Sequence, residues 1–268
     1  MTIGNKFIFL YIPKTGSSFT INVFTKINKK LKGVNKFFFQ RKKLETEMVK
    51  SKNIKARFYN YEYDQHTTIS QIDRGLLKDK KIVSIIRNPY HAYVSRYKYG
   101  SYSNTKVLEI KEYQNLAKNN FPNFPDLTFN QFIDFSLLLA KDNLEKHIKI
   151  RPKIELGILS LQFIQMFAYD PKEVLRILDF DFFEKGFKAK YFPDILFLNN
   201  KNLSDELFDF LQNEGYPKSI ISFIKVETKK NVSVSKPYET YLTKESVSKV
   251  KELEWFIFNF FSNRNGKW

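Results

Sequence analysis

Cysteine is absent from the 268 residues of the sequence. Disulfide bonds, thiolate zinc sites and cysteine nucleophiles are therefore excluded, and a cytoplasmic location is the one that we expect. Long apolar runs are also absent: no stretch reaches the length of about eighteen apolar residues that a membrane-spanning helix needs. The first residues lead directly into a core strand and lack the features of a signal peptide.

Acidic residues are scarce relative to basic ones. The chain has 28 Asp and Glu against 45 Lys and Arg, which gives a formal net charge of +17. Such a balance indicates an anionic partner: a nucleotide, an acidic glycan, a nucleic acid or a membrane surface. Part of this excess of basic residues is also explained by solvated surface lysines and by a general compositional bias toward Lys. The length, with no internal repeat or low-complexity linker, predicts one domain over 1–268.

The first informative stretch is a buried strand followed by a polar loop. Residues 7–12 form a short apolar run that is typical of a parallel strand. Pro13 ends the ladder because it has no N–H to donate, and Gly16 allows a tight turn. From Phe19 the apolar residues recur at helical spacing, which predicts a helix over 19–31.

The loop between this strand and helix is suited to an anion. Free backbone N–H groups and the helix dipole converge there, Lys14 adds a positive charge, and Thr15, Ser17 and Ser18 add hydroxyl donors. It is not a Walker A loop, because Lys14 precedes Gly16 instead of following a second glycine. An ordinary β–α turn remains the alternative.

A second strand–loop–helix unit follows over residues 81–100. Strand 81–86 ends at Arg87, Pro89 is suited to the first turn of a helix, and Gly100 ends that helix. Arg87 and Ser95 would supply a guanidinium fork and a hydroxyl to an anion. Alternating strands and helices predict an α/β fold with a parallel sheet and ligands at the carboxyl ends of the strands.

The remaining elements are predicted from hydrophobic spacing and turn residues. We expect strands over 37–39, 58–63 and 192–199. We expect helices over 44–50, 69–77, 107–118, 129–140, 156–167, 171–178, 205–213 and 243–262. Ser204 is the expected N-cap of the helix over 205–213, and 146–153 is expected to be an exposed basic loop.

Three stretches together resemble the sulfotransferase superfamily, whose donor is 3′-phosphoadenosine 5′-phosphosulfate (PAPS). Pro13-Lys14-Thr15-Gly16-Ser17-Ser18 is similar to its 5′-phosphosulfate loop. Arg87-Asn88-Pro89-Tyr90-x-x-x-x-Ser95-x-Tyr97 is similar to its 3′-phosphate motif, and Gln65–Ile72 to a segment that commonly carries the base. The resemblance extends from Phe7 to about Phe261. It implies a P-loop-like three-layer sandwich with a central parallel sheet flanked by helices.

The same resemblance predicts which regions bind the donor and the acceptor, and it shows two positions at which the sequence differs from the family pattern. Donor-binding motifs would lie in 7–100 and a helical acceptor-side region in about 101–190. The sequence has Ala92 where many members carry an arginine, and His91 where an acidic residue is common. These departures concern local salt bridges of the helix and leave the pairing of Arg87 with Ser95 in place.

Residue roles follow from the resemblance and from the chemistry. Lys14 and the loop amides would stabilise the charge that develops on the leaving phosphate, and no metal is expected. His66 is the expected base, with Glu62 as its rival. Lys236 lies in a late basic loop similar to one that covers the donor, although an exposed lysine is an equal alternative. We expect His91 and His147 to be solvated.

The predicted activity is transfer of a sulfuryl group from PAPS to a hydroxyl acceptor, a small molecule or a glycan. Two other functions compete with it. A nucleotide kinase or other P-loop NTPase lacks support because the Walker lysine and a Mg²⁺-holding carboxylate are missing. A nucleic-acid-binding protein is motivated by charge alone and does not explain the paired loops, so no nucleic-acid partner is expected.

Overall fold

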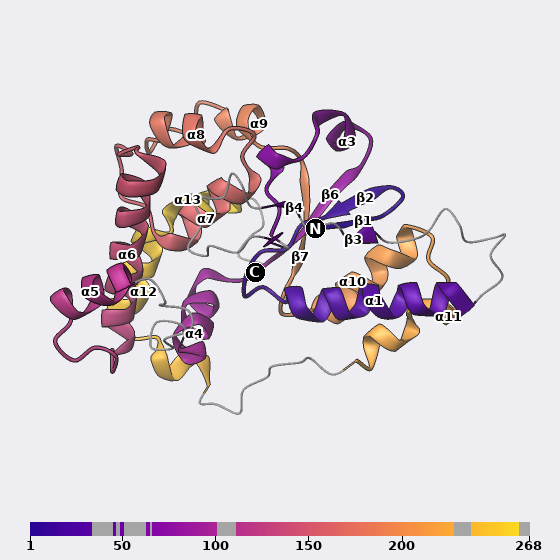
Figure 1. Cartoon of the computed structure of the whole chain (residues 1–268), viewed down its shortest axis with the longest axis horizontal. Coiled ribbons are helices and arrows are strands. Elements are labelled where there is room, and N and C mark those ends of the chain that lie inside the picture. The colour runs from indigo at the N-terminus through magenta and orange to yellow at the C-terminus, as the bar shows by residue number, and fades with distance from the viewer. Residues whose placement is uncertain are drawn as a thin grey trace.

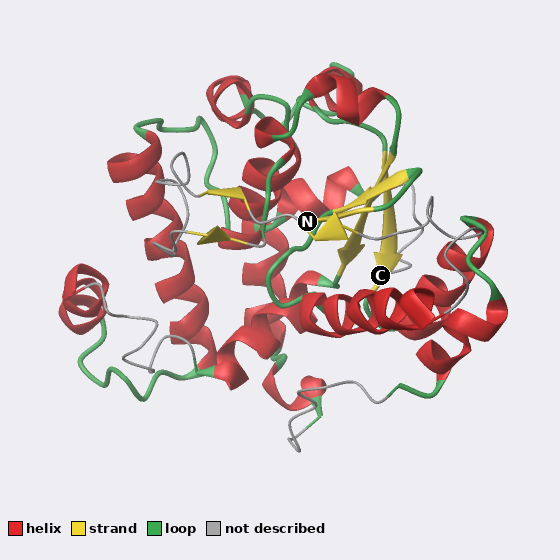
Figure 2. Cartoon of the chain, turned by 45° about the vertical axis from the view of Figure 1, so that its right-hand side comes forward, coloured by secondary structure: helices red, strands yellow, loops and turns green. Residues whose placement is uncertain are grey.

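The computed structural model describes residues 1–33, 45–46, 49–50, 63–64, 66–100, 111–227 and 237–262. The chain forms an α/β structure in which helices surround a small central sheet, as Figure 1 shows. Figure 2 separates the strands from the helices that cover them.

The described strands are short. They are β1 (Thr2–Ile3), β2 (Phe7–Phe9), β3 (Glu45–Thr46), β4 (Val49–Lys50), β5 (Tyr63–Asp64), β6 (Lys81–Ile86) and β7 (Ile195–Asn199).

The helices fall into two groups along the chain. The first half has α1 (Ser17–Gly33), the 3₁₀ turn η2 (Ile69–Gln71), α3 (Arg74–Lys78), α4 (Pro89–Tyr99), α5 (Lys111–Asn120), α6 (Phe129–Asp142) and the π-helical η3 (Asn143–Ile148). The second half has α7 (Ile158–Phe167), α8 (Pro171–Ile177), α9 (Phe187–Tyr191), α10 (Leu203–Asn213), α11 (Lys218–Ile221), η4 (Ser222–Lys225), η5 (Tyr238–Tyr241), α12 (Lys244–Leu253) and α13 (Trp255–Phe260).

The central sheet is mixed, with the strand order β3-β1-β2-β6-β7. Strands β2, β6 and β7 are parallel, as expected, whereas β1 is antiparallel to both β2 and β3. The expectation of a purely parallel central sheet is therefore wrong at one edge. Only three residues separate β1 from β2, too few for a crossover connection, so the two strands form a hairpin.

Strand β2 and, after Lys81, strand β6 are buried on both faces, and their alternating side chains enter two different cores. In β2, Ile8 packs into the core that contains α6, α7, α12 and α13, whereas Phe7 and Phe9 pack into the core beside α1 and α10. In β6, Ile82 and Val83 divide between the same two cores. A strand buried on both sides explains why its sequence is apolar at nearly every position.

Most predicted elements are confirmed, with boundaries moved by a few residues. The strands in β2, β6 and β7 and the helices in α1, α4, α5, α6, α7, α8 and α10 all form where they were expected. The helix expected over 69–77 is divided into η2 and α3. Residues 37–39 and 58–62 lie outside the described residues.

Four local predictions are wrong. Strands β3 and β4 lie where a helix over 44–50 was expected. The N-cap of α10 is Asn202 and not Ser204. The segment expected as an exposed loop over 146–153 begins within η3, which buries Leu144 and Ile148. The helix expected over 243–262 is divided into α12 and α13.

Glu254 lies at the break between α12 and α13 and is fully buried. Its Oε1 accepts hydrogen bonds from the hydroxyl of Tyr93 at 2.6 Å and the amide of Leu159 at 3.1 Å. Its Oε2 accepts from the amide of Ser160 at 2.6 Å. The carboxylate therefore caps the N-terminus of α7 and joins it to α4. Burial raises the pKa of Glu254, while these hydrogen bonds oppose that rise.

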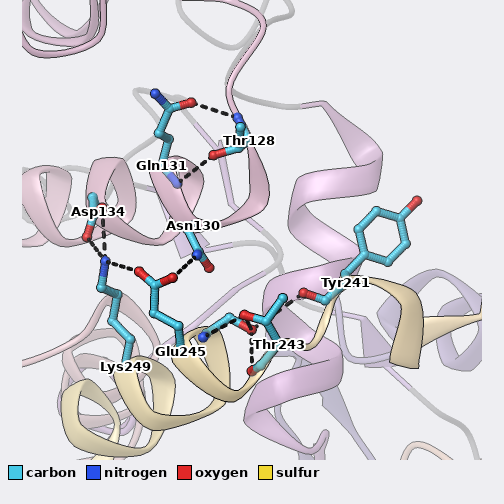
Figure 3. A network of polar contacts seen from close by, with 9 residues as sticks. Thr128, Asn130, Gln131, Asp134, Tyr241, Thr243, Glu245 and Lys249 are labelled. Atoms are coloured by element: carbon cyan, nitrogen blue, oxygen red, sulfur yellow. Dashed lines mark hydrogen bonds and ion pairs between the residues drawn. The ribbon is translucent and has the colours of Figure 1, made fainter.

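Polar contacts on the surface hold α12 beside α6, as Figure 3 shows. Lys249 pairs with Asp134 at 2.8 Å, and Asn130 Nδ2 donates to Glu245 Oε2 at 2.8 Å. The Thr243 hydroxyl caps α12 by accepting from the amide of Ser246 at 3.1 Å. Each exposed contact contributes little energy alone. Together they fix the start of α12, and with it η5, the segment directly before it.

We predict that Glu254→Gln lowers the free energy of unfolding by roughly 1–3 kcal/mol, because one buried donor then faces an amide N–H instead of an oxygen. Urea denaturation of the purified protein measures the change. Glu252→Gln is the matched control, since Glu252 lies two residues before Glu254 and its side chain is exposed. Equal stability of the two variants would show that the carboxylate does not hold these helices together.

Candidate anion-binding site

The candidate site is built where the three parallel strands end. The ladder continues past β2 through the amide of Leu10, which donates to Val83 O at 2.8 Å. It continues past β7 through the amide of Asn200, which donates to Ile86 O at 2.9 Å. The carboxyl ends of the three parallel strands therefore lie side by side, as predicted. They carry the loop of residues 10–16, Arg87 and Asn200.

Two hydroxyl groups shape the first loop from inside. Thr15 Oγ1 and Ser17 Oγ both donate to the carbonyl of Ile12, at 2.9 and 2.7 Å, and both residues are buried. Their protons are used within the loop, so they set its shape in this structure. Ser18 is exposed at the start of α1.

The loop backbone adopts conformations that most residues avoid. Lys14 has φ 65° and Gly16 has φ 112°. A Cβ at Gly16 would lie 2.6 Å from Cδ2 of Leu203 and 3.2 Å from Nδ2 of Asn200, so only glycine fits. Asn200 also donates to Thr15 O at 2.7 Å. The start of α10 therefore packs directly against the loop and holds its turn in place.

This turn leaves backbone donors for a ligand. In the described part of the chain, the amides from Lys14 to Phe19 donate to no other group, and the first amide with an acceptor is that of Thr20. The N-terminus of the 17-residue helix α1 adds its dipole at the same place. Such a set of free N–H groups is suited to a phosphate or sulfate group.

Arg87 connects the first loop to the second. Its Nη1 donates to Lys14 O at 3.1 Å, and its Nη2 donates to the hydroxyl of Tyr238 at 2.7 Å. Its Nε is buried and has no partner among the described residues. Burial lowers the pKa of Arg87. A buried donor without an acceptor, on a desolvated cation, favours the binding of an anion.

Lys14 is half-buried, with its Nζ 2.8 Å from the centre of the Tyr99 ring. Burial, together with the charge of Arg96, lowers the pKa of Lys14 to about 8. Among the described residues, none of Lys14, Arg87 and Arg96 forms an ion pair with a carboxylate. The charge that these described residues contribute is therefore positive, and a positive local charge attracts an anion.

The helix after Arg87 is fixed by its own sequence. The side chain of Asn88 caps α4 by accepting from the amide of Tyr90 at 2.9 Å, Pro89 begins the helix, and Gly100 ends it with φ 63°. Ser95 lies in this helix and is half-buried. It makes no direct contact with Arg87 within the part of the chain that the structure describes, so any shared role requires a ligand between them.

His66 lies at the same edge of the sheet. Its Nδ1 lies 2.7 Å from the carbonyl oxygen of Tyr11, three residues before Lys14. A carbonyl only accepts, so Nδ1 carries the proton and Nε2 has the lone pair of the neutral ring. The rival base Glu62 and the proposed covering residue Lys236 both lie outside the described residues.

Sequence reasoning missed three contacts at this site. Tyr238 binds Arg87, Asn200 holds the first loop, and Tyr99 covers Lys14. Tyr238 lies two residues after Lys236, so its position beside the expected covering loop could have identified it as a site residue. Nothing in the sequence distinguishes Tyr99 from the other tyrosines of α4.

Among the described residues, no group of three or more His, Asp or Glu side chains is placed to hold a metal ion. No helix in that part of the chain has the length and apolar character needed to cross a membrane.

Free amides, a lysine and an arginine at the strand ends form a candidate anion-binding site on an α/β fold. The sequence model of a family described as "Sulfotransferase family" matches residues 1–156, more than half of the 268 residues. The chain belongs to this sulfotransferase family, which confirms the resemblance and makes it a transferase by descent. No curated protein and no solved structure matches the chain.

Proposed function

We propose that the protein transfers the sulfuryl group of PAPS to a hydroxyl group of a carbohydrate acceptor. The observation that carries this proposal is the contact between the two anion-binding loops. Arg87 Nη1 lies 3.1 Å from Lys14 O, so both loops belong to one site. PAPS carries phosphate groups on both sides of one ribose, and two neighbouring anion positions fit such a nucleotide.

The two positions take different parts of the donor in this proposal. The amides of the first loop, with Lys14 and Ser18, receive the 5′-phosphosulfate, while Thr15, Gly16 and Ser17 give the loop its shape. Arg87 and Ser95 receive the 3′-phosphate. The unpartnered Nε of Arg87 and the tight packing at Gly16 are the features that fit this group. Lys236 is proposed to cover the donor.

Transfer breaks the bond between sulfur and the donor's phosphate oxygen and forms a bond between sulfur and the acceptor oxygen. Negative charge then develops on the leaving phosphate, beside the amides and the ammonium group of Lys14. Donors that are fixed in advance stabilise such charge without reorganising. Lys14, with a pKa of about 8, carries its positive charge at neutral pH.

The acceptor's proton is assigned to His66. The hydrogen bond to Tyr11 O places the proton on Nδ1, so that Nε2 is the basic atom. Glu62 remains the rival base. The acceptor itself would be held by the helical region at about 101–190.

We extend the proposal to the architecture. The chain is taken as one unit with a P-loop-like three-layer arrangement of helix, sheet and helix. Two facts support it: one continuous core contains residues from Met1 to Phe261, and helices pack on both faces of the parallel strands. In this view α12 and α13, beyond the region that the family model matches, complete the donor site through η5.

We predict that Arg87→Ala weakens the binding of 3′-phosphoadenosine 5′-phosphate by roughly 1.5–3 kcal/mol, because a charge-assisted contact is lost. Isothermal titration calorimetry measures the dissociation constants. Arg74→Ala is the control, since Arg74 is exposed in α3. A folded Arg87→Ala variant that binds as tightly as the parent would contradict the assignment of the 3′-phosphate to Arg87.

We predict that His66→Ala lowers turnover by roughly 10²–10⁴-fold and leaves donor affinity unchanged, as expected for a positioned base. The measurement is transfer of labelled sulfate from PAPS to a panel of hydroxyl acceptors. His147→Ala is the matched control, because His147 is exposed in η3. If His66→Ala keeps parental turnover while Glu62→Gln loses it, the base is Glu62.

A further inference from the structure

His91, close to Arg87 in the sequence, contacts the same tyrosine as Arg87 does. His91 is the third residue of α4, and its ring stacks on that of Tyr238 with centroids 4.8 Å apart and an interplanar angle of 25°. The hydroxyl of the same tyrosine accepts the hydrogen bond from Arg87 Nη2. The imidazole and the guanidinium group therefore both contact Tyr238.

The charged groups around His91 come from every element that meets there. Arg87 follows β6, Lys201 lies shortly after β7, and Glu239 belongs to η5. Lys98, further along α4, lies over the ring of Tyr238 at 5.2 Å from its centre. Cations thus outnumber the single carboxylate in this group of described residues.

This arrangement sets the protonation state before a ligand binds. Burial lowers the pKa of His91, Arg87 and Lys201 lower it further, and Glu239 opposes them. These surroundings favour the neutral form of the ring in the free protein.

We propose that His91 is a titratable contact of the phosphate group that docks on Arg87, and that it takes up one proton from solvent when that phosphate binds. The inference rests on the proposed function for the identity of the ligand. The physical reason is a change in the local field. A phosphate dianion near Arg87 replaces net repulsion of the imidazolium by attraction, which favours the charged ring. No other bond changes in this step.

The sign of the pH dependence follows from linkage. Because the pKa of His91 is higher with ligand bound than without it, its contribution to affinity is complete below the pKa of the free protein. That contribution is lost as the pH rises through the pKa of the complex. Donor affinity should therefore increase toward mildly acidic pH, with a limit of about tenfold per pH unit for one linked proton.

Proton uptake is measured by calorimetry. 3′-Phosphoadenosine 5′-phosphate is titrated into the protein at about pH 7 in two buffers that differ in ionisation enthalpy. We expect the parent and His147→Gln to take up more protons per ligand than His91→Gln, by up to one. The phosphate, whose own pKa is near ~6, and Lys14 titrate in all three proteins, so the comparison isolates His91.

Nuclear magnetic resonance gives a second readout that does not depend on a His91 variant. The chain has three histidines, so the ring signal of His91 can be assigned by elimination with His66→Gln and His147→Gln. Its pKa should rise when the nucleotide binds. Adenosine 5′-phosphosulfate, which lacks the 3′-phosphate, should leave it nearly unchanged.

The outcomes separate the two proposals. If the parent does not bind the nucleotide, the proposed function fails and this inference fails with it. If the parent binds but proton uptake and the pKa of His91 match those of the controls, the inference is overturned while the proposed function stands. An equal response to adenosine 5′-phosphosulfate would also overturn it, because His91 would then not report on the 3′-phosphate.

Discussion

A buried guanidinium group is the interaction on which the candidate site depends. Arg87 reaches the carbonyl of Lys14 on one side and the hydroxyl of Tyr238 on the other, 73 and 151 residues away in the sequence. Removing a cation from water is costly unless its donors find acceptors. Both acceptors are neutral, and among the described residues no carboxylate pairs with Arg87 and its Nε has no partner. An anionic ligand would supply the missing negative charge, which is why the proposed donor site is centred on this residue.

The shape of the first loop depends on packing as much as on its own residues. The positive φ of Lys14 is unusual for a residue with a side chain and persists only where the surroundings fix it. Asn200 and Leu203 provide those surroundings, and they meet the loop where Gly16 has no side chain. The anion-binding amides are thus positioned by the end of β7 and the start of α10.

The local parts of this design could be predicted from the sequence. The apolar run before Lys14, the Asn88–Pro89 turn and the Gly100 end of α4 are signals carried by adjacent residues, and each predicted its element correctly. They also identified the loops of Lys14 and Arg87 as neighbours, because parallel strands bring their carboxyl ends together.

Other features depend on contacts that no local pattern encodes. No Gly or Pro marks the break between α12 and α13 at Glu254. The break lies where the Glu254 carboxylate caps α7. The pairing of Arg87 with Tyr238 and the burial of Leu144 and Ile148 in η3 depend in the same way on distant segments. The antiparallel strand β1 is only two residues long, too short for a periodic signal.

The account's central claim is that the two loops bind one nucleotide through two separate phosphate groups. A crystal structure of the protein with 3′-phosphoadenosine 5′-phosphate tests it most directly. We predict that the 5′-phosphate lies on the amides between Lys14 and Phe19, and that the 3′-phosphate lies within hydrogen-bond distance of Arg87. A nucleotide bound elsewhere, or with only one phosphate at these loops, would contradict the claim.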